Sequence, residues 1–305
     1  MKQLVKYGLT TSLRAFELPE IWDGEQTVVI SAEGISVGAD TKNSQAISVP
    51  AGFKGTITIR RNITGNRDNT MQILVKQDSE ARIIEEITGS GTYKANVLVT
   101  AEPGCSVKYF LLQAMEEDSV CLLNYEGTGE KGSFIWNSCF LGGDTTRAVL
   151  ETRAGDEYDS QNYAVVLGSG NQQFDIHVST KHAGKHSRSN MLTKSVLDDK
   201  SRAVYHGLIN ISQDAAKIDS YQKDEVILLS DGSSADAIPN LEIHNNDVSC
   251  THGASIGKLD EEKLFYLKSR GIAEADAKRI ITEGFVEPLV LPAWQHLIRE
   301  KISRS

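Results

Sequence analysis

Hydrophobic and polar residues alternate with a period of two along most of this chain. Phe174, Ile176 and Val178 are separated by single polar residues, and residues 56–59 read Thr-Ile-Thr-Ile. This alternation predicts strands with one buried face. Residues 226–229 are continuously apolar, which is typical of a strand buried on both faces.

Short clusters rich in Gly, Asn, Asp and Ser separate these runs and favour turns, at residues 65–69, 89–91, 142–144 and 168–171. From about Gln45 to Ser255 no amphipathic helix is evident, so this region is predicted to be a series of short strands. A sandwich, a barrel and a β-solenoid all satisfy the pattern. A strict repeat would favour the solenoid, and none is evident, so the pattern alone leaves the three open.

The last part of the chain has a helical periodicity instead. Asp260 is the predicted N-cap of a first helix, which ends at Arg270 and Gly271. A second helix is predicted from about Glu274, with Gly284 as its C-cap.

A third helix is predicted from Pro292, and it places Trp294, Ile298 and Ile302 on one face. These short amphipathic helices must bury their apolar faces against the strands, against one another or against another protein. Docking on the strands is the interpretation that the pattern favours.

Composition narrows the class of function. The 305 residues include 32 basic and 41 acidic ones, a net charge of −9, which disfavours nucleic-acid binding through phosphate neutralisation. No apolar stretch approaches the roughly 20 residues of a membrane span, and no secretory signal is evident. The four scattered cysteines form no Cys-x-x-Cys pair. We therefore expect a cytoplasmic protein with reduced thiols, without nucleic acid or membrane as partners.

Motifs for nucleotide binding and catalysis are missing from the sequence. Neither Gly184-Lys185 nor Gly257-Lys258 has the other residues of a phosphate-binding loop, and no Gly-x-Ser-x-Gly motif is present. His182 and His186 are four residues apart, but Gly184 between them indicates a loop, so a metal site there is disfavoured. We expect no catalytic residues and no enzymatic activity.

One stretch carries a pair of candidate ligands. If residues 248–252 are extended, Cys250 and His252 point the same way, roughly 7 Å apart. Thiolate and imidazole together suit iron or zinc, and a protonated imidazole would lower the pKa of the thiol. The spacing alone favours the other interpretation, a buried cysteine beside a hydrogen-bonded histidine. Two ligands do not complete a metal site, so others must come from elsewhere in the fold or from a second subunit.

Several motifs between residues 205 and 285 resemble the SufB/SufD family, the scaffold-type components of SUF iron–sulfur cluster assembly. In order, they are Tyr205-His206-Gly207-Leu208-Ile209, Leu228-Leu229-Ser230, Pro239-x-Leu241-Glu242-Ile243, Asn246-Asp247-Val248-Ser249-Cys250-Thr251-His252-Gly253-Ala254, Leu259-Asp260-Glu261-Glu262-x-Leu264-Phe265-Tyr266-Leu267-x-Ser269-Arg270-Gly271 and Gly284-Phe285.

The resemblance implies a mainly β fold, a right-handed parallel β-helix (β-solenoid) with a C-terminal helical region. It implies an N-terminal segment (1–44), a β-helix core (45–257) and a helical region (258–305) that docks a SufC-like ABC ATPase. The partner-binding residues expected there are Asp260, Leu264, Phe265, Tyr266, Arg270, Ile280 and Phe285.

The resemblance also implies a role for the Cys-x-His pair. Cys250 and His252 are similar to the SufD motif at the subunit interface, because Gly253 follows where SufB has Glu. They would bind a transient iron–sulfur cluster, of the [2Fe–2S] type if two copies meet across a two-fold axis. The chain would pair with itself or with a SufB/SufD homologue, and a cysteine desulfurase system would supply sulfur.

The sequence leaves the roles of other residues, and two alternative functions, open. SufB carries a scaffold cysteine where residues 222–225 have none, and Asp224 or Glu225 is either an oxygen ligand or a solvated strand charge. Cys105, Cys121 and Cys139 are expected to pack in the core, and these are the remaining cysteines of the chain. The chain could also be architectural, supporting an active homologue without binding metal. A carbohydrate-active β-helix enzyme is the weakest alternative, since no carboxylate pair stands out.

Overall fold

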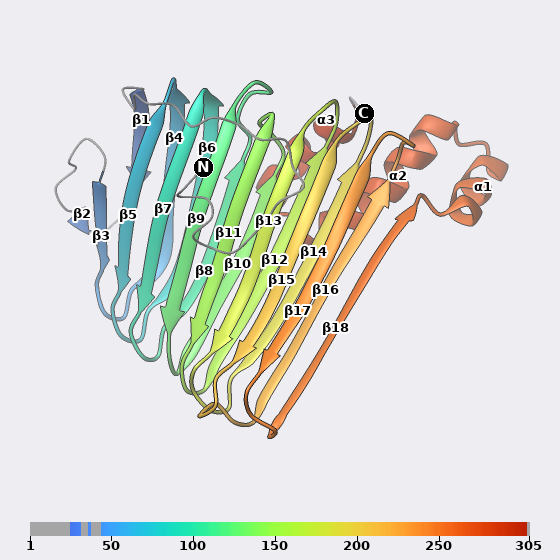
Figure 1. Cartoon of the computed structure of the whole chain (residues 1–305). Helices are drawn as coiled ribbons and strands as arrows, with labels where there is room; N and C mark the ends of the chain where they lie inside the picture. Colours follow the sequence, from blue (N-terminus) through green and yellow to red (C-terminus); the bar gives the residue numbers. More distant parts are fainter. Residues whose placement is uncertain (1–24, 32–35, 38–43, 304–305) are drawn as a thin grey trace, which may run out of the picture.

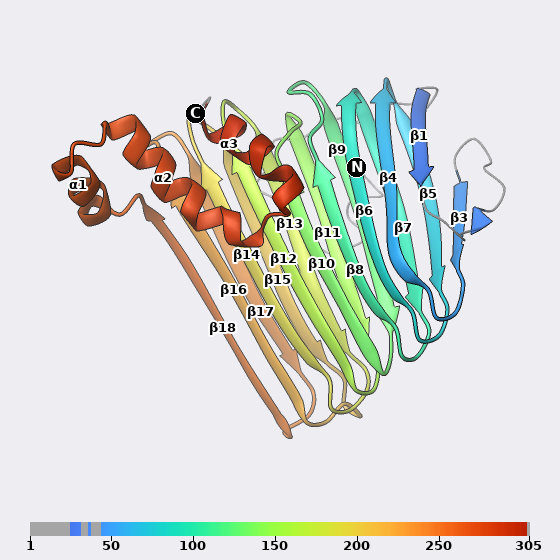
Figure 2. The same cartoon turned by 180° about the vertical axis from the view of Figure 1, so that it is seen from behind.

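The computed structural model describes residues 25–31, 36–37 and 44–303, with side chains from residue 44 onward. Two nine-stranded sheets face each other across one core (Figures 1 and 2). The strands are β1 (Glu25–Ser31), β2 (Ser36–Val37), β3 (Ser44–Val49), β4 (Lys54–Thr64), β5 (Arg67–Val75), β6 (Glu80–Ser90), β7 (Thr92–Ala101), β8 (Ser106–Gln113), β9 (Val120–Gly129), β10 (Gly132–Phe140), β11 (Thr145–Ala154), β12 (Tyr158–Gly168), β13 (Gln173–His182), β14 (Arg188–Leu197), β15 (Arg202–Ile211), β16 (Ile218–Leu228), β17 (Ser234–Ile243) and β18 (Val248–Lys258).

Successive strands alternate between the two sheets, so each turn of the chain adds one strand to each. Sheet A contains β1 and the even-numbered strands from β4 to β18, and sheet B contains β2 and the odd-numbered strands from β3 to β17. Neighbours within a sheet are parallel, apart from the antiparallel pairs β1–β4 and β2–β3. The fold is a β-solenoid of about eight turns, which confirms the predicted fold class. Most of the predicted N-terminal segment, residues 1–44, lies outside the described residues.

The length of a turn drifts along the solenoid. Ile57 is the register partner of Ile83, a spacing of 83 − 57 = 26 residues, whereas Gln222 is the partner of His252, a spacing of 252 − 222 = 30. Turns of unequal length keep the strands in register while the loops absorb the extra residues. This drift explains why the sequence shows no clean repeat.

Inward-facing side chains fill the space between the sheets. Trp136 is fully buried, and its ring lies 4.6 Å from that of Phe134, 4.9 Å from Tyr109 and 6.0 Å from Tyr125, measured between centroids. The predicted face of Phe174, Ile176 and Val178 is buried as well, as are the three cysteines that were expected in the core, Cys105, Cys121 and Cys139.

A charged pair lies inside this apolar core. The side chains of Arg61 and Glu85 are both fully buried, and the Arg61 guanidinium donates to the carboxylate of Glu85. The hydroxyls of Tyr109 and Tyr125 also donate to Glu85, at 2.6 and 2.7 Å. Burial, with the nearby charge of Glu85, raises the pKa of Tyr109 well above its usual value, so the hydroxyl stays protonated as a donor. A buried charge is tolerated when it is paired in this way.

The C-terminal region contains three α-helices and two short 3₁₀ turns. They are α1 (Glu261–Ser269), α2 (Glu274–Val286), η2 (Glu287–Leu289), η3 (Pro292–Trp294) and α3 (Gln295–Ser303). The Asp260 carboxylate accepts hydrogen bonds from the backbone N–H groups of Glu262 and Lys263, so the predicted N-cap is confirmed. The predicted C-cap at Gly284 is wrong: α2 runs through it to Val286, where the chain enters the 3₁₀ turn η2.

The helices differ in how they meet the solenoid. Trp294, Ile298 and Ile302 are buried in a second apolar cluster against the outer face of sheet A, and the Trp294 indole donates to Glu86 at 2.9 Å. Figure 2 shows α3 lying over this face. Ile227 of β16 and Leu229, which follows this strand, also pack against this cluster. Their contacts explain why residues 226–229 are apolar on both faces of the strand. The predicted docking on the strands therefore holds for the end of the chain.

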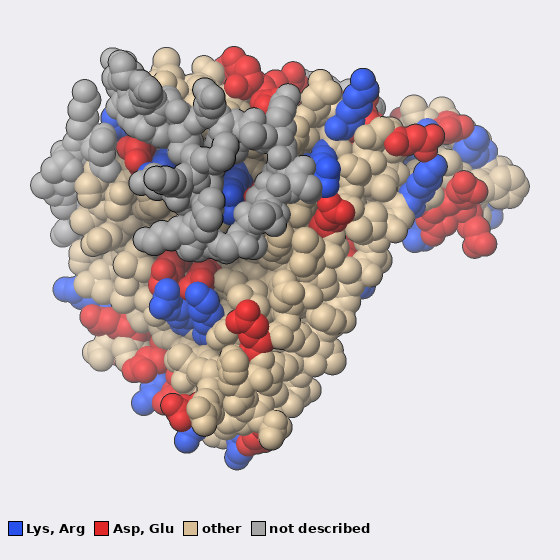
Figure 3. Space-filling view, viewed as in Figure 1, with Lys and Arg blue, Asp and Glu red and all other residues tan. Residues whose placement is uncertain are grey.

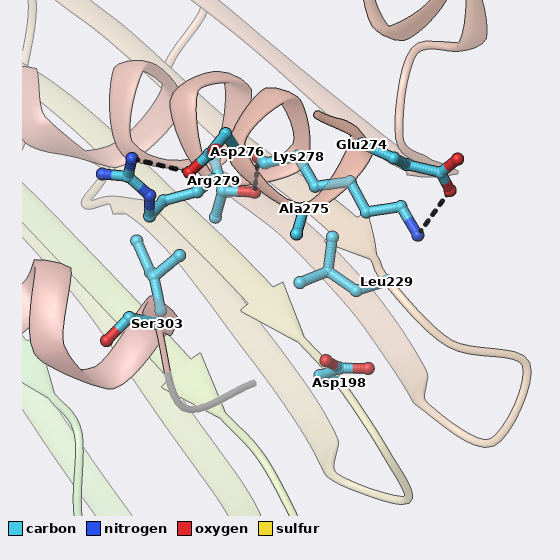
Figure 4. Close-up of a pocket in the computed structure, with 10 residues that line it drawn as sticks. Asp198, Leu229, Glu274, Ala275, Asp276, Lys278, Arg279 and Ser303 are labelled. Atoms are coloured by element: carbon cyan, nitrogen blue, oxygen red, sulfur yellow. Dashed lines mark hydrogen bonds and ion pairs between the residues drawn. The ribbon is translucent and has the colours of Figure 1, made fainter. Parts of the chain in front are cut away.

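Helix α1 and the first half of α2 project from the solenoid, and α1 contains no buried residue (Figure 1). A cavity of about 660 Å³ separates α2 from α3 and from Asp198 and Leu229 at the strand ends (Figure 4). The charged residues of α2 along this cavity are paired among themselves, for example Arg279 with Asp276 at 3.1 Å. The cavity lies where α1 and the first half of α2 extend away from the solenoid.

In the view of Figure 3, charges of both signs gather on the side of the N-terminal turns and on the projecting helices, and the lower right of this face is mostly uncharged. Among the described residues, no helix has the length and apolar character needed to cross a membrane.

Candidate functional site

Cys250 and His252 lie on β18, the last strand of sheet A. Their register partners on β16 are Ser220 and Gln222, whose side chains are buried inside the solenoid. Register partners on parallel strands point to the same side of a sheet, so Cys250 and His252 both face inward, roughly 7 Å apart along the strand. The predicted orientation is confirmed.

The interior is open at this end. β17 and β18 are the last strands of their sheets, and within the described residues no further turn covers them. His252 and Ile256 face inward yet are exposed, and Cys250 is half-buried. The inward residues of β17 include the small or rigid Ala237 and Pro239, together with the half-buried Leu241. Cys250 and His252 therefore line the interior of the solenoid at the end that no further described turn covers.

The thiol is not activated in the single chain. Burial, with the nearby charge of Asp219, raises the pKa of Cys250 above its usual value. The expectation that the imidazole of His252 lowers this pKa is thus not met in the isolated chain. A metal ion would have to displace the thiol proton, which makes binding pH-dependent.

Asp224 and Glu225 lie on opposite sides of β16. Glu225 faces outward and pairs with Lys223 at 2.6 Å, as a solvated strand charge would. Asp224 faces inward beneath Ala254 of β18 and is 1% exposed, so the description as a solvated charge is wrong for this residue. Its Oδ1 atom has no hydrogen-bond partner among the described residues, which leaves it available as an oxygen ligand.

Asp224 makes stability depend on pH. Burial, reinforced by Glu225, raises its pKa from 3.8 to about 7. Above pH 4 the unfolded carboxyl is ionised while the folded one stays protonated, so the folded state loses stability as pH rises to about 7, by up to about 4 kcal/mol. We expect Asp224→Asn to stabilise the protein at pH 8 and to leave stability nearly unchanged at pH 4.

Urea unfolding at several pH values tests this expectation. Asp219→Asn is the matched control, because Asp219 lies on the same strand with an exposed side chain. Equal effects of the two substitutions at pH 4 and pH 8 would contradict the buried, protonated state of Asp224.

Polar side chains line the interior next to the pair. The imidazole of His182 lies 2.7 Å from the hydroxyl of Ser187 and 3.0 Å from that of Ser189, and Ser189 is hydrogen-bonded to Ser220, the neighbour of Cys250. Burial lowers the pKa of His182 to about 4, so the ring is neutral at pH 7. Both of its nitrogens are occupied by hydroxyls, which agrees with the disfavoured metal site at His182.

The residues expected to bind a partner fall into three groups. Phe265, Tyr266 and Ile280 are 74%, 57% and 43% exposed on α1 and α2, and the Arg270 guanidinium lies 5.4 Å from the centroid of the Tyr266 ring. Phe285 instead lies against the solenoid, where its carbonyl accepts from Lys194 at 2.8 Å.

The remaining two residues, Asp260 and Leu264, stabilise the projecting helix α1 itself. Asp260 caps α1, as described above, and Leu264 is half-buried on the same helix. Through these contacts the two residues position the exposed aromatic side chains of α1. They do not enlarge the exposed surface.

The structure contains a second cluster of candidate ligands that the sequence pattern did not indicate. Asp175, His177 and His206 place one ligand atom each within 4.8 Å of one another on the outer face of sheet B. The alternation around Phe174 already placed Asp175 and His177 on the outward face, but their proximity to His206 depends on a register that the sequence did not reveal.

The chain matches known proteins over the region just described. Residues 61–285 match the family model described as SUF system FeS cluster assembly, SufBD core domain. The iron–sulfur cluster assembly protein SufD of Escherichia coli K12 is 35% identical over 165 residues, which cover 52% of this chain and 38% of SufD.

Two further relatives are more distant but match over a longer region. SufD of Bacillus subtilis is 29% identical over 226 residues, 68% of this chain and 52% of the relative. An iron–sulfur cluster assembly SufBD family protein of Mycobacterium bovis is 27% identical over 245 residues, 77% of this chain and 62% of the relative. The chain spans less than two thirds of the length of these relatives. It belongs to the SufBD family of the SUF iron–sulfur cluster assembly system.

Proposed function

We propose that this protein is a scaffold or accessory subunit of a SUF-type system, on which an iron–sulfur cluster is assembled with the help of a SufC-like ABC ATPase. The observation that carries the proposal is the position of Cys250 and His252, which face the interior of the solenoid at its uncovered end. A soft thiolate and a borderline imidazole suit iron in a cluster.

A second subunit completes the ligand set. β17 and β18 are edge strands of 10 and 11 residues, and long edges of this kind favour pairing with another chain. A two-fold pairing through this end brings together two thiolates and two imidazoles, which suffices for a transient [2Fe–2S] cluster. The second subunit is another copy or a SufB/SufD homologue, and a cysteine desulfurase system is the expected sulfur source.

The pairing surface can be tested with one substitution. Ile256 faces inward at the open end and is 43% exposed, so Ile256→Asp would bury an unpaired charge in the interface. We expect this variant to elute as a monomer when size-exclusion chromatography is combined with light scattering. Ile238→Asp is the control, because Ile238 is similarly exposed at 40% but lies on the outer face of β17. Loss of the dimer in both variants, or in neither, would contradict pairing through the open end.

The projecting arm formed by α1 and the first half of α2 is the proposed ATPase-docking element. Its Phe265 and Tyr266 are exposed aromatic residues, of which Tyr266 also contacts Arg270, and aromatic residues dominate the binding energy of many interfaces. A groove of about 380 Å³ between α1 and α2, lined by Tyr266, Leu267 and Ile281, adds an apolar recess beside them.

Truncation of one aromatic residue tests this docking. We expect Phe265→Ala to weaken binding of the SufC-like ATPase by about 30-fold, equivalent to about 2 kcal/mol, because the ring would be buried in the complex. Titration calorimetry with the purified ATPase measures the change. Glu261→Ala, an exposed substitution on the same helix at a residue that does not line this groove, is expected to change the affinity less than threefold. Equal weakening by the two variants would argue against a specific aromatic contact.

An architectural role is the second candidate. The raised pKa of Cys250 favours it, because a metal ion must displace the thiol proton and a higher pKa makes this harder at neutral pH. Co-expression distinguishes the two roles: a scaffold acquires iron–sulfur absorption as a homodimer, whereas an architectural subunit acquires it only together with a homologous SufB/SufD chain. We assign catalytic residues in neither case.

A further inference from the structure

A cluster of metal-binding side chains lies on the outer face of sheet B, away from the open end. His177 of β13 and His206 of β15 are register partners, so their side chains are neighbours on the same face. Their rings stack with centroids 4.2 Å apart and planes inclined by 4°. Asp175 lies two residues before His177 on that face, and its Oδ1 atom is 2.7 Å from His177 Nε2 and 3.7 Å from His206 Nε2.

These ligand atoms are buried but not fully used. The Asp175 side chain is 1% exposed, and those of His177 and His206 are 9% and 12% exposed. Within the described residues, His206 Nε2 and Asp175 Oδ2 have no hydrogen-bond partner. Buried polar atoms without partners are uncommon in native proteins and point to a missing ion or water.

One basic side chain also contacts the carboxylate of this cluster. Arg147 is the register partner of Asp175 on β11, and its Nε atom lies 3.5 Å from Oδ2, so it contacts one edge of the carboxylate and leaves Oδ1 to the histidines. The Nε2 atoms of both imidazoles therefore lie beside Oδ1, where they can be offered to an ion.

Space for further ligands exists beside the cluster. His177 and His206 line a groove of about 340 Å³, which also contains Glu151, Lys181 and Glu242. Water can reach the two rings from this groove and complete a coordination sphere.

We propose that Asp175, His177 and His206 bind one divalent first-row transition-metal ion. Two imidazoles and one carboxylate on one side of an ion, with open positions opposite, suit Fe²⁺, Co²⁺ or Zn²⁺, whereas Mg²⁺ and Ca²⁺ prefer oxygen ligands alone. Binding requires the stacked rings to tilt apart, because an ion about 2.1 Å from each Nε2 must lie in both ring planes. The site is separate from the Cys250 pair and does not depend on the proposed assembly function.

Cobalt titration of the full chain tests the site. The double variant Cys250→Ser/His252→Ala removes the open-end ligands and serves as the parent. We expect it to bind one equivalent of Co²⁺ with weak visible d–d bands and no thiolate-to-metal charge-transfer band. Asp175→Asn and His206→Ala in this parent are each expected to weaken Co²⁺ binding more than about 100-fold, beyond the usual effect of losing an outer-shell partner.

The control is His296→Ala in the same parent, because His296 is exposed on α3, next to sheet A. Its Co²⁺ affinity is expected to equal that of the parent. Circular dichroism checks the fold of each variant. Proton NMR of the Co²⁺-loaded parent needs no substitution in the site, and it should show two strongly shifted, exchangeable imidazole N–H signals. Co²⁺ binding that is unchanged in His206→Ala, or an NMR spectrum without these signals, would overturn the proposal.

Discussion

Cys250→Ser is expected to abolish reconstitution of the iron–sulfur cluster while leaving the fold intact. The thiolate is the softer of the two ligands at the open end, and a serine hydroxyl is a poor substitute for iron in a cluster. Since Cys250 is only half-buried on the last strand, its replacement should cost no more than about 1 kcal/mol of stability. Anaerobic reconstitution with Fe²⁺ and sulfide, followed by visible absorption and iron analysis, measures the loss.

Cys105→Ser is the matched control for this result. Cys105 is buried at the start of β8, and its Sγ contacts the carbonyl oxygen of Lys76 at 3.1 Å, which a serine hydroxyl can also do. The control variant should acquire as much cluster as the unmodified chain. A Cys250→Ser protein with the unmodified absorption spectrum would refute the ligand role of this thiol.

Glu85→Ala is expected to destabilise the fold by about 3–5 kcal/mol. The substitution leaves the Arg61 guanidinium buried without its counter-ion and removes the acceptor of two tyrosine hydroxyls. Breaking a buried pair from one side is costly because the remaining charge stays desolvated. Urea unfolding followed by circular dichroism measures the change.

Two further variants give this experiment its contrast. Glu80→Ala, at the start of the same strand, breaks an exposed ion pair with Lys54 and should change the stability little. The double variant Arg61→Leu/Glu85→Leu removes both charges and should recover much of the loss. A loss from Glu85→Ala as small as that from Glu80→Ala would show that the buried pair contributes little to the fold.

The alternation of residues predicted much of the strand content but not the architecture. The inward face of Phe174, Ile176 and Val178 is buried as predicted, and Asp260 caps α1 as its position before two glutamates indicated. Local patterns of this kind reflect local geometry. The solenoid itself came from family resemblance, since unequal turn lengths conceal the repeat.

Features that depend on register were not predictable. Asp224 looked like a surface charge beside Glu225, and only the position of β16 between two other strands shows that it is buried. His177 and His206 are 29 residues apart in sequence (206 − 177) and become neighbours only through the pairing of β13 and β15. A pattern read along one strand contains no information about which residues lie in the next turn.

The helical region shows a similar limit. The apolar face around Trp294 was correctly predicted to dock on the strands, yet the amphipathic pattern of α1 gave no sign that it remains without buried residues. Helical periodicity identifies an apolar face but not the surface that covers it. This is why the exposed Phe265 and Tyr266 became informative only in three dimensions.

Thiol cross-linking of the purified dimer tests most directly whether the open ends of two solenoids meet. Mild oxidation, non-reducing electrophoresis and peptide mass spectrometry identify the cysteines that join. We expect a covalent dimer linked through Cys250, either to the same residue of a second copy or to a cysteine of a SufB/SufD partner. Cys250→Ser should form no such dimer. A stable dimer in which Cys250 stays reduced and accessible to alkylation would contradict pairing through the open end.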